Sequence, residues 1–168
     1  MNSVGSYNKY VLIALLFILQ TTNVMGAQKA DAVLVIKSEK RLYLLNNGTS
    51  FASFSVTFGA NPTGHNQAQG DERAPERDYL LDYKNPNSKF YKSIHISYPN
   101  AEDRANARRL GVDPGGDIMI HGLGKGWEWA ASLASFFYWT NGCIALSNRD
   151  MDRVWEAVDP GTPIEIRP

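Results

Sequence analysis

The sequence predicts a mainly β domain of the α+β class that contains two or three helices. Short runs rich in β-branched and aromatic residues recur along the chain, and turn-forming residues separate them. Only a few segments combine helical periodicity with capping residues. The chain has 168 residues, of which 43% are hydrophobic and 20% charged, as is usual for one globular domain.

The first 27 residues are set apart from this domain by their composition. Lys9 is their only charged side chain, Tyr10–Leu19 is apolar, and Gly26 and Ala27 are small. This layout is typical of a secretory signal peptide, and the apolar run is too short to span a bilayer. We expect residues 1–27 to be a signal peptide and residues 28–168 to be the domain. An uncleaved signal anchor is the alternative.

Cleavage would leave an exported protein in the periplasm or cell envelope, without a stable membrane span. No cysteine lies near residue 27, which excludes a lipid anchor at that junction.

Three strands are expected at the amino end of the domain. The segments Ala32–Ile36 and Arg41–Leu45 are joined by a short link, which favours a hairpin. Asn47-Gly48 is a strong turn signal because both residues accept positive φ. Phe51–Phe58 alternates in polarity and is the third expected strand, so this region predicts an antiparallel meander.

A long polar loop is expected next, over Gly59–Pro75, and loops of this length are usually functional or mobile. The strand candidates that follow it are Tyr79–Tyr83, Ser93–Tyr98 and the short segment Asp117–His121. Thr162–Ile166 is expected to form the last strand.

Three segments have helical patterns. Ala101–Leu110 lies between Asn100 as the N-cap and Gly111 as the C-cap. Trp127–Trp139 has helical periodicity and dense aromatic residues, either as core or as a lid beside a site. Ser147 caps the last helix, with Asp150 at the capping-box position. Its apolar stripe consists of Met151, Val154, Trp155 and Val158.

Charge and cysteine content exclude several classes of function. A formal net charge of zero argues against a broad nucleic-acid surface. The single cysteine excludes an internal disulfide framework and a multi-cysteine zinc site. The three histidines show no metal-binding spacing, so neither a metal nor another cofactor is expected.

Cys143 and His121 are the residues best suited to chemistry. A nucleophilic thiol needs a base that removes its proton or holds it as a thiolate–imidazolium pair. It also needs backbone N–H groups directed at the developing oxyanion, which Gly142 can supply together with Cys143. Spacing alone leaves open that Cys143 is a buried core residue and His121 a satisfied buried histidine.

The motif His121-Gly122, followed by Thr140-Asn-Gly-Cys-Ile-Ala-Leu-Ser-Asn, resembles the signature of the L,D-transpeptidase catalytic domain (YkuD-type) family. The resemblance extends over residues 31–168 and is strongest to the short exported branch related to YafK. It implies a YkuD-type, β-sandwich-like fold. The other segments that carry it are residues 37–45, 70–76, 93–100 and 161–166.

The resemblance also implies a mechanism. Cys143 would attack the carbonyl of the third residue of a peptidoglycan stem peptide, release the terminal D-Ala and form a thioester. An amine acceptor, on a second stem or a wall-linked protein, or water would then take the acyl group. His121 would be the base, Gly122 would orient its ring through the backbone carbonyl, and Gly142 and Cys143 would stabilise the oxyanion. Thr140 matches the hydroxyl position of the motif.

Two positions depart from the family pattern. Asn141 stands where many members have histidine, and Ala145 stands where many have arginine. Arg73, in the long loop, could supply the missing positive charge to a substrate carboxylate. Both departures fit a branch that contains hydrolytic members.

The remaining polar candidates are weaker. His95, on an expected strand, is either an inward polar residue of the sheet or a substrate contact or second base. His65 is expected to be solvated in the long loop. Paired loop carboxylates for glycan cleavage are disfavoured, because acids in loops are usually solvated.

The sequence therefore predicts an exported cysteine acyltransferase, an L,D-transpeptidase acting on peptidoglycan stem peptides. The first alternative is a hydrolytic member, namely an L,D-carboxypeptidase or an amidase that releases wall-attached protein. The second is a non-catalytic wall-binding module, which a thiol without a depressed pKa in a labelling profile would favour.

Overall fold

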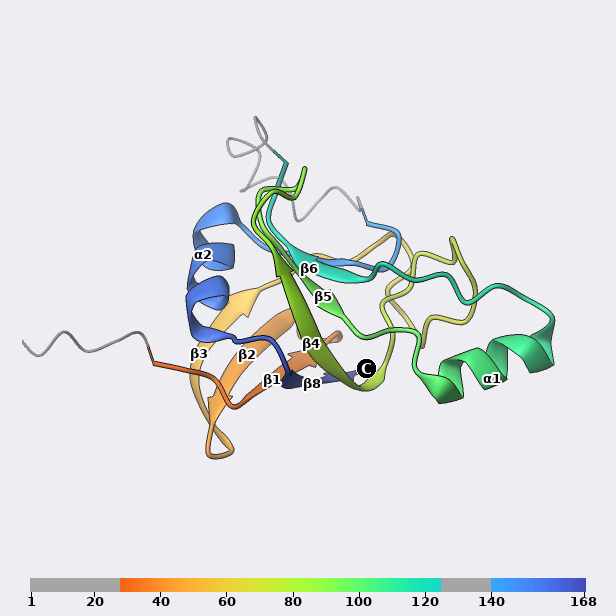
Figure 1. Cartoon of the computed structure of the whole chain (residues 1–168), viewed down its shortest axis with the longest axis horizontal. Helices are drawn as coiled ribbons and strands as arrows, with labels where there is room; N and C mark the ends of the chain where they lie inside the picture. The colour runs from red at the N-terminus through yellow and green to blue at the C-terminus, as the bar shows by residue number, and fades with distance from the viewer. Residues whose placement is uncertain (1–27, 125–139) are drawn as a thin grey trace, which may run out of the picture.

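The computed structural model describes residues 28–124 and 140–168, and this part of the chain forms one eight-stranded sheet with two helices (Figure 1). The order across the sheet is β3-β2-β1-β8-β4-β5-β6-β7. The strands are β1 (Ala32–Ile36), β2 (Arg41–Asn46), β3 (Thr49–Ser55), β4 (Arg77–Asn85), β5 (Ser93–Ile96), β6 (Met119–His121), β7 (Ile144–Ala145) and β8 (Thr162–Arg167). The expected mainly β, α+β class is confirmed.

The amino-terminal strands form the predicted antiparallel meander, with β1 paired to β2 and β2 to β3. Asn47 and Gly48 form the two-residue turn between β2 and β3, at φ angles of 50° and 73°. Positive φ at both positions is the geometry of a type I′ hairpin turn. The third strand begins before Phe51 and ends at Ser55, so its expected bounds were too late at both ends.

β8 joins the two halves of the sheet. It pairs in parallel with β1 and antiparallel with β4, so the last strand in sequence lies in the middle of the sheet. The other half continues through β5 and β6 to β7, which pairs in parallel with β6.

The sheet curls until its two ends meet. Beyond β3, Thr57 pairs with Ala145 of β7 through two backbone hydrogen bonds of 2.9 Å each. This contact pairs the outer edge of β7, which the sequence analysis did not recognise as a strand. The backbone N–H and carbonyl of Ala145, on the edge of the sheet close to residue 143, thereby gain hydrogen-bond partners.

Two helices flank the sheet, at opposite ends of the molecule in Figure 1. α1 (Ala101–Leu110) begins at Asn100, whose side chain and that of Asp103 form a reciprocal capping box, and ends at Gly111 in the left-handed conformation. α2 (Asn148–Ala157) begins after Ser147, whose hydroxyl accepts a hydrogen bond from the Asp150 N–H. The expected helix Trp127–Trp139 lies outside the described residues.

The core lies between the concave sheet and α2. Met151, Val154 and Val158 of the predicted apolar stripe are fully buried, and Trp155 packs against the core at its edge. They meet the side chains of alternate strand residues, including Val33, Val35, Leu42, Leu44, Leu81, Ile94, Ile96, Ile120, Ile144, Ile164 and Ile166. Within residues 28–124 and 140–168, none of the helices is long and apolar enough to cross a bilayer.

Candidate active site

Strand register brings His121 and Cys143 to one face of the sheet. Ile120 is opposite Ile144 and His121 is opposite Ala145, so Cys143 falls opposite Met119 at the start of the same pair of strands. Ile120 and Ile144 point into the core, and the alternate residues Met119 and His121 point to the other face. The Met119 N–H donates to Cys143 Sγ at 3.4 Å, which fixes the thiol beside β6.

His121 is buried and oriented by its neighbour. Its Nδ1 lies 2.7 Å from the carbonyl oxygen of Gly122. Because a carbonyl only accepts, Nδ1 carries the proton and Nε2 keeps the lone pair that can take a proton. Burial lowers the pKa of His121 below 6.5, and the hydrogen bond to Gly122 offsets part of this effect. The ring is therefore a neutral base at pH 7.

Cys143 is a partly buried thiol. Burial raises the pKa of Cys143, the Met119 N–H acts in the opposite direction, and the negative charge of Asp117 raises it further. A raised thiol pKa beside a neutral imidazole means that Cys143 is a thiol at pH 7. The arrangement suits a base that removes the proton as the thiol attacks, rather than a preformed thiolate–imidazolium pair.

The turn that presents Cys143 is clamped by the long loop. Gly142 has a φ of 96°, and a Cβ on it would stand 2.5 Å from the backbone oxygen of Arg73. A Cβ on Gly59 would stand 2.2 Å from the backbone oxygen of Thr140. Close backbone approach at both ends of the turn leaves room for glycine alone.

Thr140 and Asn141 occupy different environments in this turn. The buried Thr140 hydroxyl donates to the Cys143 carbonyl at 2.7 Å, so it braces the turn from within. Asn141 is exposed at the tip.

Arg73 meets the turn through its backbone. Its carbonyl lies against Gly142 and also accepts a hydrogen bond of 2.9 Å from the buried side chain of Asn66. Its guanidinium group is directed toward Gly64, and its charge helps to lower the pKa of Lys37. The side chain thus lies on the loop side of the turn.

Lys37 anchors the long loop through hydrogen bonds and an ion pair. Its buried ammonium group donates to the backbone oxygens of Gly64 and Ala74, at 2.6 and 3.2 Å, and forms a 2.7 Å ion pair with Glu76. Burial lowers the pKa of Lys37, and Glu76 partly offsets that effect. One side chain therefore ties residue 64 of the loop that clamps the Cys143 turn to the carboxyl-terminal end of that loop.

A second polar group, on β5, lies across β6 from the thiol. His95 is directly opposite Met119 in the sheet, and its Nδ1 lies 2.6 Å from an Asp82 carboxylate oxygen. The ring of Tyr83 stacks on His95 at 4.6 Å between centroids. The sequence indicates His95 as a candidate but neither of its partners, because a bulge in the pairing of β4 with β5 sets the direction of Asp82 and Tyr83.

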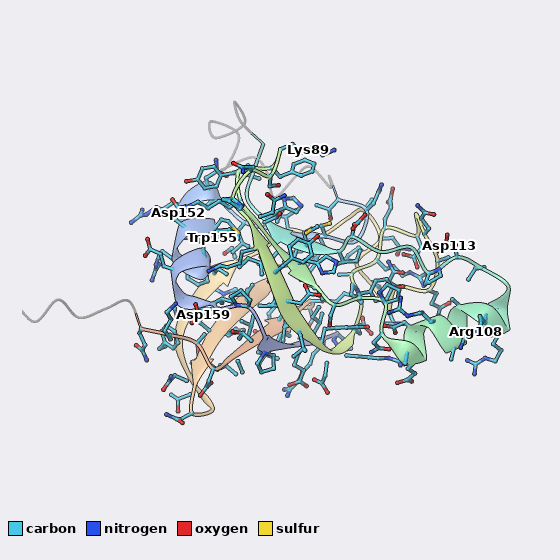
Figure 2. All side chains as sticks on the ribbon, in the orientation of Figure 1. Lys89, Arg108, Asp113, Asp152, Trp155 and Asp159 are labelled. Carbon is cyan, nitrogen blue, oxygen red and sulfur yellow. The ribbon has the colours of Figure 1, made fainter. Side chains whose placement is uncertain are left out.

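Phe90 covers the other end of the site. Its ring lies 4.8 Å from that of His121, although 43% of the residue is exposed. It lies in the loop between β4 and β5, next to Lys89, which extends from the tip of that hairpin in Figure 2. Within residues 28–124 and 140–168, no cluster of three or more His, Cys, Asp or Glu residues could hold a metal ion.

The curled mixed sheet thus places a buried histidine at the end of β6 and a glycine-flanked thiol directly before β7, the strand that pairs with β6 in parallel. The chain belongs to the YkuD family, the L,D-transpeptidase catalytic domain, whose family model matches residues 30–166. The family resemblance inferred from the sequence is therefore confirmed.

The chain is 31% identical to YafK of Escherichia coli strain K12 over 108 residues, which are 63% of this chain and 36% of that protein. It therefore spans about a third of the length of that relative. Among solved structures, the helical cell shape determining protein Pgp2 of Campylobacter jejuni is similar at a TM-score of 0.61 and 26% identity, over 80% of this chain and 46% of Pgp2. An L,D-transpeptidase of Xylanimonas cellulosilytica shares the fold at a TM-score of 0.52 and 13% identity, over 83% of this chain and 61% of that one.

Proposed function

We propose that this protein is an exported L,D-transpeptidase that uses Cys143 to form a thioester with peptidoglycan stem peptides. Family membership supports an enzyme that acts on peptidoglycan peptides. The observation that carries the finer proposal is the pairing of β6 with β7, which puts a neutral, oriented His121 on the same face as a protonated thiol.

In the proposed first step, Nε2 of His121 takes the thiol proton as Sγ attacks the carbonyl carbon of the third stem residue. The N–H groups of Gly142 and Cys143 stabilise the oxyanion, for which the positive φ of Gly142 turns the backbone. His121 then gives its proton to the departing nitrogen of D-Ala. The C–N bond breaks, and a thioester remains on Cys143.

We assign supporting roles to the other candidates. Gly122 holds the His121 tautomer through its carbonyl, and Thr140 braces the turn. Exposed Asn141 contacts the stem peptide, and Arg73 provides positive charge to a substrate carboxylate. Loss of stem-peptide binding in Arg73→Ala would support that last role, and unchanged kinetics would remove it.

The second step, transfer of the acyl group from Cys143 to an acceptor, distinguishes the two enzymatic functions. An amine acceptor gives a cross-link or an attachment of wall-linked protein, whereas water gives L,D-carboxypeptidase or amidase activity. A non-catalytic wall-binding module is the third alternative, which the sequence analysis linked to a thiol without a depressed pKa. Because His121 can remove the proton during attack, a raised pKa of Cys143 does not separate the module from the enzyme, and product formation is the criterion that does.

Incubation with purified disaccharide-tetrapeptide, followed by mass spectrometry, tests the proposal. We expect a dimer that has lost one alanine; a monomeric tripeptide would make water the acceptor. Cys143→Ala should abolish both products, while a Cys143→Ser variant should fold equally well and lose the thioester. If the unaltered protein gives neither product nor an acyl-enzyme with stem peptides or wall-linked protein fragments, the enzymatic proposal is wrong.

A further inference from the structure

We propose that His95, held by Asp82, is the group that receives the proton of the acyl acceptor's ammonium group. This inference rests on the proposed function and concerns its second step. An alkyl amine is mostly protonated near pH 7, so it must lose a proton before it can attack a thioester. His121 takes the proton that the amine loses after it attacks the thioester. A second group is therefore needed to remove the first proton from the ammonium group before the attack.

Register places His95 in line with the nucleophile, with Met119 of β6 between the two. His95 is opposite Met119, whose N–H donates to Cys143 Sγ, while His121 is opposite Ser93 two residues along β5. Residues opposite each other in an antiparallel pair share a face of the sheet. The two histidines therefore lie on the same face, with His121 further along β6 and His95 across from the thiol.

The partners of His95 suit a base. With Nδ1–H donating to the Asp82 carboxylate at 2.6 Å, Nε2 carries the lone pair. Asp82 is 40% exposed and the His95 side chain 15%, so a proton can leave the pair for solvent.

The surroundings of the His95–Asp82 pair favour the binding of a cationic group. The stacked Tyr83 ring is 45% exposed and offers a face beside His95. The charges of Asp117 and Asp82 both act on Tyr83, and Asp117 also acts on Cys143. Asp82 and Tyr83 thus place a carboxylate and an aromatic face beside His95, and Asp117 adds negative charge near Tyr83 and Cys143, which suits an alkylammonium group.

The proposed step is balanced in protons and bonds. The acceptor R–NH3+ gives one proton to Nε2 of His95, which releases it to solvent. The neutral amine attacks the thioester carbonyl carbon and forms the C–N bond. Its surplus proton passes to His121 as the intermediate collapses, the C–S bond breaks, and His121 returns that proton to the Cys143 thiolate.

Single-turnover decay of the preformed acyl-enzyme tests the assignment. Disaccharide-tripeptide supplies an acceptor ammonium group but no terminal D-Ala, so it cannot act as a donor. Hydroxylamine is largely uncharged near neutral pH and needs no prior deprotonation. For His95→Gln we expect tripeptide transfer to slow about 100-fold, with hydroxylamine transfer and D-Ala release within about twofold of the unaltered protein.

Asp82→Asn keeps the shape of the pair and should give a smaller loss of the same kind. Leu80→Ala, a change at another exposed side chain of β4, should change neither rate. Equal slowing of both nucleophiles, a parallel fall in D-Ala release, or no effect of His95→Gln would overturn the assignment. Absence of an acyl-enzyme in the unaltered protein would instead overturn the proposed function on which it rests.

Discussion

The backbone carbonyl of Arg73 lies against the α-carbon of Gly142, so close that a Cβ there would stand 2.5 Å from the oxygen. A loop more than sixty residues earlier in the chain therefore shapes the turn that presents Cys143. The contact joins backbone to backbone, so a substitution at Gly142 tests how closely the two backbone segments can approach.

Gly142→Ala should cost far more function than its backbone strain alone predicts. The added methyl group meets a backbone atom that cannot turn away, so the turn must shift and the Cys143 N–H must move with it. We expect acylation by stem peptide to fall at least about 100-fold, as for loss of an oxyanion donor, measured as acyl-enzyme formation by mass spectrometry.

Gly161→Ala is the matched control for this change. Gly161 has a φ of 92°, close to that of Gly142, but nothing lies within 4 Å of its Cβ position. It should lose about 1 kcal/mol of stability to backbone strain and retain acylation. Equal acylation by the two variants would contradict the role given to the Arg73 contact.

The pH dependence of acylation should follow the neutral state of His121. Because burial lowers the pKa of His121, protonation removes the base only at pH values below 6.5. We expect the acid limb of the acylation rate to be centred below pH 6.5. An acid limb centred above pH 6.5 would show that the histidine is stabilised as an imidazolium.

The alkylation rate of Cys143 with iodoacetamide should follow a titration with its midpoint above pH 9, since burial raises the pKa of the thiol. A rate plateau across neutral pH would instead reveal a thiolate–imidazolium pair. The same profile in His121→Gln is the control: a neutral histidine holds no thiolate, so the substitution should leave the profile in place while abolishing acylation.

Phe90→Ala should move the acid limb of the acylation profile upward. The Phe90 ring lies 4.8 Å from the His121 ring between centroids, so its loss should expose His121 to water and bring the pKa of His121 closer to 6.5. Leu80→Ala removes an equally exposed side chain at 47% exposure and should leave the profile unchanged. An unshifted limb in Phe90→Ala would mean that other residues exclude water from the histidine.

Lys37→Met should destabilise the domain and loosen the long loop. It leaves the half-buried Glu76 carboxylate and two loop carbonyls without their donor. Removal of one partner from a buried pair costs about 3 kcal/mol, which urea unfolding will measure. Lys29→Met breaks an exposed ion pair with Asp159 and should not shift the urea midpoint; a comparable shift in both would contradict the anchoring role.

Local signals predicted much of this fold. The bounds of α1 follow from Asn100 and Gly111, because each satisfies backbone groups at its own end of the helix. The hairpin at Asn47-Gly48 follows from two positive φ angles. β7 escaped prediction because two residues carry no periodicity; its pairing with β6 and Thr57 comes from the closure of the sheet.

The candidate site likewise contains residues that local sequence motifs predict and contacts that they do not. Cys143, His121 and their glycines belong to two short sequence motifs, His121-Gly122 and Thr140–Cys143, so the sequence marks them. Asp82 and Tyr83 reach His95 through a bulged register, and Lys37 reaches Glu76 across the long loop. Such pairings depend on the whole sheet, and no local pattern of residue types encodes them.

The central position of β8 also sets an order for folding. The meander β1–β3 and the strands β4–β7 can each begin to pair as they emerge from the ribosome, but the strand that bonds to both is synthesised after them. Strand pairing across so long a stretch of chain is slow, because the chain loses the entropy of loop closure before the new contacts stabilise it. The Thr57–Ala145 bridge beside Cys143 needs both halves in place. A nascent chain that still lacks β8 should therefore carry its thiol without a working environment, which keeps the unfinished protein chemically idle.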